Sequence, residues 1–511
     1  MTTETINIYQ SKALVNFEGK NFLGQIGIDS RIFKRLNDEG ISVGVISQQA
    51  IENGISVLVD EKDAINAVRV LNEEFREEKA SAIVDNIYCV NNVAVIGFVS
   101  ENYSKILSEL QRNKIFPLLL NQIATTGRVN IVVTDDQTDI AKSIVETEIY
   151  GKPKVVHLAL IGHGNVGGTL MEQILDSAHD ILKRKRLELK VVAIANSKKM
   201  ALNKGGFGSD WRQKMKYSQT PSNVENLIRY AKEHHLENLV MVDNTASKDF
   251  VKHYDFFVEN GFDVVSSNKI YNTLPISQYR NLRKSLEKNN KQYLYETNVG
   301  AGLPLIDTIK LLHLSGENIT RIKGVFSGTL SYVFNNFSLR EEQFSTIITE
   351  ALEKGFTEPD PREDLSGNDV ARKLLILARE LDLINEFDDI SIQNLVPKAL
   401  SSISKSEFIE RLEELDDDYQ KIKEDQKPNH VLRYVGDLHG DLQKDKGELD
   451  VKLISVPATS ALGQLKGSDS IFEIYTESYG ENPIVIMGAG AGAQVTARGV
   501  FGDILRISAT K

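Results

Sequence analysis

The sequence has little cysteine, no long apolar run and no surplus of basic residues. A single cysteine, Cys89, excludes an internal disulfide and a cysteine-based zinc site. No apolar run approaches the roughly 18 residues of a membrane span, and the first ten residues lack the charged and apolar regions of a signal peptide. A net charge of -11 argues against nucleic acid or an anionic membrane as the main partner, because both select basic surfaces. We therefore expect a cytoplasmic protein that binds neither nucleic acid nor a membrane.

The length of 511 residues predicts about three or four domains, and the first 150 residues repeat one pattern. Each copy alternates between periods of 2 and 3.6 residues in the order strand, helix, strand, strand, helix. The expected elements are Ala13–Phe17, Ser30–Asn37, Ser42–Ser47, Ile55–Val59 and Ala64–Phe75, then Val93–Val99, Tyr103–Asn113, Phe116–Leu120, Val129–Val133 and Asp139–Ile149. This repeat predicts paired βαββα modules that share a sheet edge. Cys89, at the entry to the second copy, is interpreted as a small buried or edge residue rather than a nucleophile.

A glycine-rich motif follows these modules. The apolar run Val155–Ile161 leads directly into Gly162, Gly164 and Gly167, which have the spacing G-x-G-x-x-G. In a dinucleotide-binding unit the first glycine permits a tight turn, the second lets a pyrophosphate approach, and the third lets the helix pack on the strand. A tight strand-to-helix corner has the same spacing, so the flanking strand and helix patterns carry the interpretation. A later glycine series, around Gly492, is expected to close over this site.

Three further apolar segments predict strands of the same sheet. They are Glu188–Ala195, Leu239–Asp243 and Asp263–Ser266. Ligands of such sheets bind outside the carboxyl ends of the strands, which is where Thr245 and Lys269 fall. The first segment is followed by Lys198 and Lys199 rather than by an acid. This favours NADP over NAD, although surface lysines also serve solubility.

The segment Glu296–Pro304, ETNVGAGLP, places a carboxylate before a glycine-rich turn. Such a loop offers one charged oxygen and several carbonyl oxygens to a hard cation. A turn that only joins two domains is the alternative, and the residues by themselves favour that alternative.

The stretch Gly355–Lys373, GFTEPDPREDLSGNDVARK, is dense in acidic residues. Its two prolines are expected to hold Glu358 and its neighbours in an extended loop. Ser366 with Asp369 three residues later is a capping signature for the following helix. Asp369 and Lys373 are four residues apart and share one helical face, where the lysine borders apolar surface. This spacing fits both a partly desolvated proton-transfer lysine and an exposed helical ion pair.

From about Val155 to Ile507 the chain resembles homoserine dehydrogenase. The motifs GHGNVGG, VDNT, SNK, ETNVGAGLP, FSGTLSYVFN, FTEPDPREDLSGNDVARK and GAGAGAQVTARGVFGDI occur in that family's order. The two N-terminal modules resemble tandem ACT domains, on the segments Gly40–Asp60 and Phe116–Thr134. The whole chain is thus similar to bifunctional aspartokinase–homoserine dehydrogenases without their kinase domain.

The resemblance implies an α/β and α+β multidomain protein. Residues 1–80 and 81–150 are expected to form tandem βαββα ACT-like regulatory modules. Residues 151–300, completed by 481–511, would form a Rossmann NAD(P)-binding domain, and 301–480 an α+β substrate-binding and dimerisation domain. The family further implies a homodimer or homotetramer.

The resemblance also assigns roles to residues. Lys373 is implied as the general acid/base on the carbonyl oxygen, and Lys269 assists it. Glu358 and Asp369 would orient the substrate, with Asp364 in support. The implied cofactor positions are Gly162, Gly164, Asn165, Val166, Gly167, Thr245, Lys269 and Gly492. Sodium would be bound by the Glu296 carboxylate and by the carbonyl oxygens of Val299, Ala301 and Leu303. The effector would be held by Gln48 and Gln122.

The implied reaction is the reversible NAD(P)H-dependent reduction of L-aspartate 4-semialdehyde to L-homoserine, with NADP(H) preferred, NAD(H) also accepted and threonine as the expected effector. An oxidative route through a thiohemiacetal needs a cysteine nucleophile, and Cys89 lies in the sensor region. The alternative is a non-catalytic amino-acid sensor that retains the dehydrogenase fold, but the presence of both Lys269 and Lys373 favours the enzyme. Phe356 and Glu363 depart from the family's tyrosine and aspartate, which is expected to weaken substrate contacts.

Overall fold

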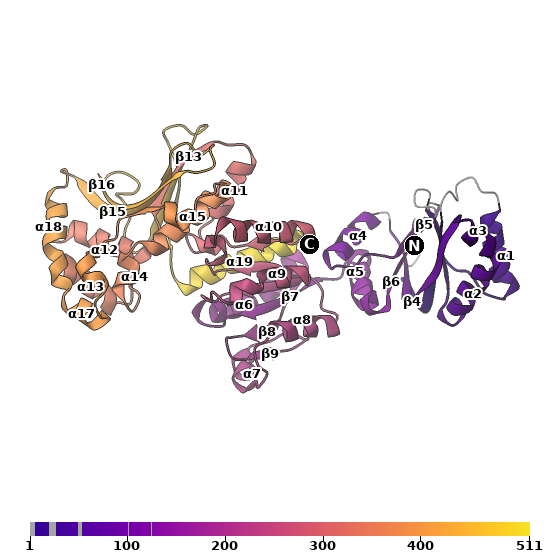
Figure 1. Ribbon diagram of the computed structural model, residues 1–511. Helices are drawn as coiled ribbons and strands as arrows, with labels where there is room; N and C mark the ends of the chain where they lie inside the picture. Colours follow the sequence, from indigo (N-terminus) through magenta and orange to yellow (C-terminus); the bar gives the residue numbers. More distant parts are fainter. Residues whose placement is uncertain (1–5, 20–26, 50–53, 101, 124, 511) are drawn as a thin grey trace.

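The computed structural model describes residues 6–19, 27–49, 54–100, 102–123 and 125–510, without the side chains of Gln48, Gln49 and Thr510. Three six-stranded sheets follow one another along an elongated chain (Figure 1). None of the helices in these residues is long and apolar enough to cross a membrane.

The first sheet contains both N-terminal modules. Their elements are β1 (Asn7–Gly19), α1 (Ile28–Asp38), β2 (Ile46–Gln49), β3 (Gly54–Asp60), α2 (Ala64–Glu74) and α3 (Arg76–Ala80), then β4 (Val84–Val99), α4 (Tyr103–Arg112), β5 (Leu119–Ile123), β6 (Arg128–Thr134) and α5 (Thr138–Tyr150). The predicted βαββα order is confirmed in both copies, with α3 as an addition. β2 and β5 begin later than predicted; in β5 the reason is Pro117, which has no N–H to donate to a ladder.

The two modules share one continuous sheet, as predicted. Its order is β2-β3-β1-β4-β6-β5, and the modules join where β1 pairs with β4 in antiparallel register, with Val15 opposite Cys89. The half-buried Cys89 thus lies on a central strand. The two edge strands also approach each other, because the Asn121 side-chain amide donates to the Ile46 carbonyl at 3.2 Å. The sheet is therefore strongly curled.

The second sheet is parallel except for one short edge strand. Its order is β12-β11-β10-β7-β8-β9. The elements are β7 (Lys154–Ile161), α6 (Asn165–Lys185), β8 (Leu187–Ala195), β9 (Met200–Leu202), α7 (Trp211–Tyr217), α8 (Val224–Glu233), β10 (Leu239–Asp243), α9 (Tyr254–Glu259), β11 (Asp263–Ser266), α10 (Ile276–Asn289) and β12 (Tyr293–Leu294). β10 and β11 have the predicted bounds, and β8 begins one residue earlier than predicted.

The third sheet, of order β14-β16-β15-β13-β17-β18, lies at the far end of the molecule. Its part of the chain contains α11 (Ile306–Leu314), β13 (Ile319–Val325), α12 (Gly328–Leu339), α13 (Phe344–Glu353), α14 (Pro361–Leu365), α15 (Asn368–Glu380), β14 (Ser391–Ile392), α16 (Lys398–Ser401), α17 (Lys405–Glu410), α18 (Asp416–Glu424), β15 (His430–His439), β16 (Glu448–Pro457), β17 (Ser470–Thr476) and β18 (Ile484–Gly488). The prediction that residues 481–511 complete the nucleotide-binding domain is wrong for β18, which pairs with β17 and belongs to the third sheet. The last helix, α19 (Ala493–Thr510), returns to the second sheet, where its apolar side chains share a core with those of α6.

The second module is fixed to the parallel sheet by a set of polar contacts. The amide of Asn238 donates to the Asn113 side chain at 2.7 Å, and the Asn113 side chain donates back to that of Asn238 at 3.2 Å. Ser143 on α5 donates to Glu237 at 2.8 Å. Burial raises the pKa of Glu237, and the bond from Ser143 opposes the shift. Because Glu237 and Asn238 immediately precede β10, the second module contacts the parallel sheet at the start of that strand.

Candidate active site

The glycine turn between β7 and α6 has the geometry of a dinucleotide site. Gly162 has a φ of 82°, and a Cβ there would lie 2.8 Å from the Thr245 side chain. A Cβ on Gly167 would lie only 1.9 Å from the Gly162 carbonyl oxygen. A Cβ on Gly164, in contrast, would meet no atom within 4 Å. Packing therefore requires the first and third glycines, while the second faces the open space where a pyrophosphate would approach.

A cavity of about 630 Å³ adjoins this turn. Its lining includes Gly164, Asn165, Lys199, Trp211, Arg212 and Lys216. Trp211 is held by a 3.0 Å bond from its indole nitrogen to Glu172, and Arg212 lies over the Trp211 ring and also contacts Glu172. The sequence patterns do not single out Trp211 and Arg212, because these residues lie in a glycine- and lysine-rich segment without clear periodicity. The adjacent aromatic and cationic side chains were the only signal for them.

Asp243, at the end of β10, joins the two loops that carry Thr245 and Lys269. Its carboxylate accepts from the Thr245 backbone amide at 2.8 Å, from the Tyr254 hydroxyl at 2.7 Å and from the Asn268 side-chain amide at 3.1 Å. Burial raises the pKa of Asp243, while these donors favour its charged form. The loops after β10 and β11 are thereby held together at the carboxyl edge of the sheet.

The other two predicted cofactor positions flank the same edge. Val166 lies in the first turn of α6 and packs against the core between the sheet and α19. Gly492 has a φ of 115° in the turn that begins α19, and the next residue, Ala493, lines the 630 Å³ cavity. The C-terminal helix therefore contributes to the wall of the nucleotide cavity.

Lys269, Asp369 and Lys373 meet at one point, although the sequence separates the first from the others by a hundred residues. The Lys373 ammonium lies 2.8 Å from Oδ2 of Asp369, and the Lys269 ammonium lies 3.7 Å from Oδ1. Lys373 also donates to the Phe326 carbonyl at 2.7 Å. Its side chain is 11% exposed, so the exposed helical ion pair considered for Asp369 and Lys373 is wrong for the lysine.

The charges of this cluster alter one another's protonation. Burial acts to raise the pKa of Asp369, but the two ammonium groups outweigh it and hold that pKa well below its ordinary value. Asp369 is also the largest influence on Lys269 and acts to raise its pKa. Burial and the charge of Lys373 together outweigh it, so the net effect lowers the pKa of Lys269. The Asp369 carboxylate thus interacts with the ammonium groups of Lys269 and Lys373 at the same time.

The acidic loop before α15 differs in detail from the prediction. Asp360 is extended, but Pro361 begins the short helix α14. The predicted capping by Ser366 is wrong, because Gly367 precedes α15 in the left-handed conformation and Ser366 ends α14. The αL geometry favours glycine at residue 367, and the Ser366 hydroxyl accepts from the Asn368 amide at 3.3 Å rather than from the amide of Asp369. Asp369 enters the first turn of α15 instead.

The predicted substrate residues Glu358 and Asp364 are linked through the backbone. The Glu358 amide donates to Asp364 at 2.8 Å, and the Glu358 side chain is exposed. Burial raises the pKa of Asp364. Phe356 stacks on Tyr332 with ring centroids 4.4 Å apart, while Glu363 is exposed. Thus Asp364 positions the loop, and the Phe356 ring packs where the family's tyrosine is expected.

The loop after β12 carries the four residues predicted to bind sodium. Gly300 and Ala301 both have positive φ, at 77° and 51°, which turns the backbone sharply. The Glu296 carboxylate accepts from the amides of Ile306 and Asp307 at the start of α11, at 2.7 and 3.0 Å. Arg506 lies 3.5 Å from the same carboxylate. Both Glu296 oxygens are therefore occupied by donors of α11 and Arg506, and a cation here would have to share them. Within the described residues no three His, Cys, Asp or Glu side chains form a metal site.

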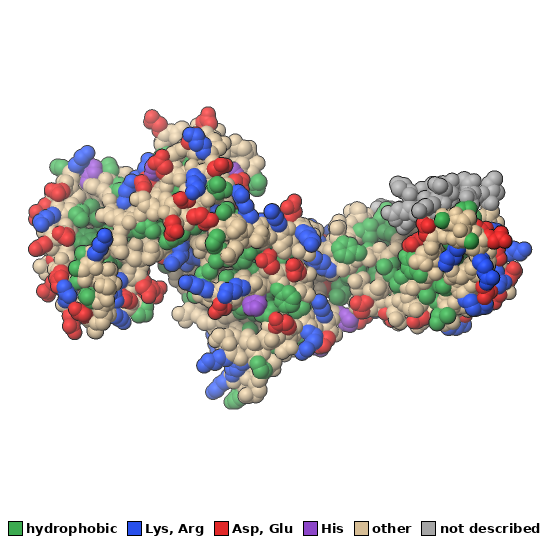
Figure 2. Space-filling view, in the orientation of Figure 1, with side chains coloured by type: hydrophobic (Ala, Val, Ile, Leu, Met, Phe, Trp, Pro, Cys, Tyr) green, Lys and Arg blue, Asp and Glu red, His purple; other side chains and the backbone are tan. Residues whose placement is uncertain are grey.

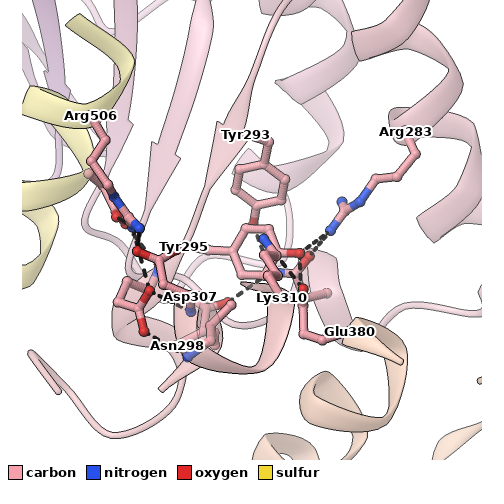
Figure 3. A network of polar contacts seen from close by, with 12 residues as sticks. Arg283, Tyr293, Tyr295, Asn298, Asp307, Lys310, Glu380 and Arg506 are labelled. Atoms are coloured by element: carbon pink, nitrogen blue, oxygen red, sulfur yellow. Dashed lines mark hydrogen bonds and ion pairs between the residues drawn. The ribbon is translucent and has the colours of Figure 1, made fainter. Parts of the chain in front are cut away.

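A buried polar network connects the segments that carry Lys269 and Lys373 (Figure 3). The Tyr295 hydroxyl donates to Glu380 at 2.6 Å and accepts from Arg283 at 2.8 Å, and Lys310 lies 3.3 Å from Glu380. Arg283 also donates to the Asn272 side chain at 3.0 Å. Asn272 follows the Lys269 loop, and Glu380 lies on α15 two turns beyond Lys373. The network therefore fixes the two lysine-bearing segments relative to each other.

The predicted effector residues lie at the edges of the first sheet. Gln122 is on β5, where it pairs with Val129, and its side chain is exposed. The Gln48 side chain lies outside the described residues, although its backbone pairs with Ile55. A cavity of about 520 Å³ between the sheet edges is lined by Asn121 and Ile123 but not by Gln122. Alternation along β5 directs Gln122 to the other face.

The parallel sheet has a glycine turn at the end of its first strand, and a second domain places a lysine and a carboxylate at the strand ends. This arrangement defines a Rossmann-type dinucleotide-binding protein. Family models match an ACT domain at residues 15–75, a homoserine dehydrogenase NAD-binding domain at 162–296 and homoserine dehydrogenase at 304–505. Homoserine dehydrogenase of Saccharomyces cerevisiae is 35% identical over 371 residues, which cover 70% of this chain and 98% of the yeast protein. The chain belongs to the homoserine dehydrogenase family and carries an N-terminal ACT domain.

Longer relatives and solved structures are also similar. Bifunctional aspartokinase/homoserine dehydrogenases of Arabidopsis thaliana and Haemophilus influenzae are 37% and 34% identical over 97% of this chain. The alignments cover 55% and 61% of those proteins, so the chain spans little more than half their length. A Candida auris protein of unknown function has a TM-score of 0.63 and 34% identity, covering 70% of this chain and 99% of that one. A hyperthermophilic archaeal homoserine dehydrogenase in complex with NADPH, 22% identical, has the same fold, with a TM-score of 0.53 over 70% of this chain and 98% of that one.

Proposed function

We propose that the protein is a homoserine dehydrogenase that interconverts L-aspartate 4-semialdehyde and L-homoserine. The observation that carries this proposal is the cluster of Lys269, Asp369 and Lys373 at the carboxyl edge of the parallel sheet. Two lysines on one carboxylate are suited to bind an oxygen and to transfer a proton to it. The choice of L-aspartate 4-semialdehyde and L-homoserine as substrates rests on membership of the homoserine dehydrogenase family.

The proposed proton path uses Lys373. In the reducing direction its ammonium protonates the oxygen of the aldehyde as negative charge develops there, and in the oxidising direction the neutral amine accepts that proton. Asp369 fixes the Lys373 ammonium at 2.8 Å and compensates the second positive charge of Lys269. Glu358 is proposed to hold the substrate's amino group, on a loop that Asp364 keeps in place.

NADP(H) is proposed as the preferred cofactor, with NAD(H) also accepted. When bound, it supplies or accepts the hydride at the aldehyde carbon. The open space at Gly164 accommodates the pyrophosphate, and Lys199, Arg212 and Lys216 offer cations to a ribose 2′-phosphate. A sodium ion is proposed at the carbonyl oxygens of Val299, Ala301 and Leu303 and the carboxylate of Glu296, where it would stiffen the loop between the two domains.

Regulation by an amino acid, with threonine as the candidate, is proposed for the two N-terminal modules. The 520 Å³ cavity between the sheet edges, which Asn121 and Ile123 line, is the feature that supports it. Assembly as a homodimer or homotetramer and a cytoplasmic location stay predictions from the sequence.

The decisive experiment is NADPH oxidation by the full chain with L-aspartate 4-semialdehyde, repeated with NADH and with threonine. Turnover supports the dehydrogenase, and a threonine effect supports a regulatory role of the modules. If neither nicotinamide cofactor is turned over while threonine binds, the non-catalytic sensor is the correct assignment.

A further inference from the structure

A second large cavity, of about 930 Å³, lies where the regulatory modules meet the parallel-sheet domain. Its walls are the end of α5, the connecting segment 151–154, the last turns of α6 and one face of α19. The end of α19 approaches α4 and α5 here (Figure 1), and Figure 2 shows the molecule narrowing at the same place. The nucleotide cavity lies at the opposite end of α6, and a 21-residue helix is about 30 Å long. The two cavities are therefore separate sites.

The floor of this cavity is apolar. Ile181 on α6, Phe501 and Leu505 on α19 and Leu187 at the start of β8 all contribute to it. Gly502 lies on the same face of α19, and a Cβ there would meet no atom within 4 Å. The cavity thus contains unfilled space directly above apolar side chains.

The rim of the cavity is strongly basic in a protein of net charge -11. Seven lysines and arginines line it against two acidic residues, Glu148 and Asp180. Both acids are already paired, with Lys105 at 2.7 Å and with Arg184 at 3.6 Å.

Three of the basic side chains, Lys185, Arg186 and Arg498, have no carboxylate partner within the part of the chain that the structure describes. Cations at the end of α6 also stabilise the helix dipole, which accounts for Lys185. The dipole of α6 does not account for Arg498, which lies on α19. Arg186 is held close to the connecting segment, since its guanidinium lies 3.2 Å from the Cβ position of Gly151.

We propose that this cavity binds an organic anion with an apolar body. Unpaired guanidinium groups recognise carboxylates and phosphates, and the apolar floor accepts the rest of the molecule. The volume lies in the range of small-molecule sites. A ligand here contacts the regulatory modules and the nucleotide-binding domain at once, so its binding stabilises one relative placement of the two.

The test uses 8-anilinonaphthalene-1-sulfonate, an anion with an apolar body, titrated by fluorescence into the full chain saturated with NADP⁺. Saturation keeps the dye from the nucleotide cavity. Gly502→Trp fills the cavity without changing its charge, and a Lys185→Gln/Arg186→Gln/Arg498→Gln variant removes the unpaired cations without filling it. Lys183→Gln, on the same turn of α6 but outside the lining, is the matched control.

We expect one saturable dye site per chain, at least a tenfold loss of affinity in both cavity variants and less than a twofold change in Lys183→Gln. The melting temperature reports whether Gly502→Trp folds, and the charge variant decides if it does not. Absence of saturable binding, or equal affinity in the wild type and the charge variant, overturns the proposal.

Discussion

Asp369 Oδ2 lies 2.8 Å from the ammonium of Lys373, one turn further along α15. The other oxygen of the same carboxylate faces Lys269, which comes from the loop after β11 in a different domain. This contact joins a helix of the third sheet's domain to the carboxyl edge of the parallel sheet. The proposed proton transfer therefore depends on the Asp369 carboxylate. Helix spacing relates Asp369 to Lys373, but no sequence periodicity relates it to Lys269.

Asp369→Asn is predicted to lower kcat by about 10²-fold and to shift the alkaline limb of the pH profile to lower pH. In the reducing direction Lys269 must stay positively charged to assist Lys373, so the rate falls as pH rises through the pKa of Lys269. The carboxylate acts to raise the pKa of Lys269, so its loss lowers that pKa further. Steady-state rates from pH 6 to 10 test this. Asp388→Asn, an exposed acid on the same domain, should leave the limb unchanged, and an unshifted limb in Asp369→Asn contradicts the prediction.

The glycine turn gives a matched pair of substitutions. Gly167→Ala places a Cβ 1.9 Å from the Gly162 carbonyl and should lower the free energy of unfolding by about 1–3 kcal/mol. Gly164→Ala meets no protein atom, so it should leave the melting temperature unchanged while weakening NADPH binding about tenfold. Denaturant unfolding and NADPH fluorescence titration separate the two effects. Equal affinity for NADPH in Gly164→Ala and the wild type would place the pyrophosphate elsewhere.

Cofactor preference is predicted to depend on Arg212. Loss of a charge-assisted bond to a 2′-phosphate costs about 1.5–3 kcal/mol, so Arg212→Gln should reduce kcat/KM for NADPH at least tenfold. The value for NADH should change little, because NADH lacks that phosphate. Lys214→Gln, on the same helix but outside the cavity lining, is the control. An equal fall with both cofactors would show that Arg212 does not read the phosphate.

The buried network in Figure 3 predicts an effect of a single hydroxyl. Tyr295→Phe removes the hydroxyl that joins Glu380 to Arg283. The Glu380 carboxylate then retains Lys310, and the Arg283 guanidinium retains Asn272, but each loses a hydrogen bond in a buried site. Stability to urea should fall by about 1–3 kcal/mol. A lower kcat should follow, since Glu380 anchors the helix that carries Lys373. Tyr279→Phe keeps the ring that lies beside Arg283 and should change stability by less than about 0.5 kcal/mol.

Strong local patterns made much of the parallel sheet predictable. β10 and β11 are short runs with an apolar centre and a polar residue at the carboxyl end, and the structure has them at the predicted residues. β15 was not predicted, because its buried positions include Arg433 and Asp437. Arg433 bonds to three backbone carbonyls of the loop before β17, and Asp437 pairs with Arg321. Such partners come from distant segments, so the strand carries no apolar alternation.

Helix ends were predicted less well than strands. The charge pattern from Ser404 to Asp425 predicts one helical segment, but the structure divides it into α17, a 3₁₀ turn at Leu412–Leu415 and α18. Phe408, Leu412 and Leu415 are all buried, and turning the chain there directs each of them into the core. Similarly, the pairing of Lys269 with Asp369 required the resemblance to known proteins, because no sequence spacing relates the two.

The most direct test of the account compares turnover and cofactor binding in Lys373→Met. NADPH binding, measured by fluorescence, should stay within about twofold of the wild type, because Lys373 lies outside the nucleotide cavity. NADPH oxidation with L-aspartate 4-semialdehyde should fall by about 10²–10⁴-fold, the usual contribution of a positioned general acid. Turnover within a few-fold of the wild type would contradict the assignment of Lys373 as the proton donor.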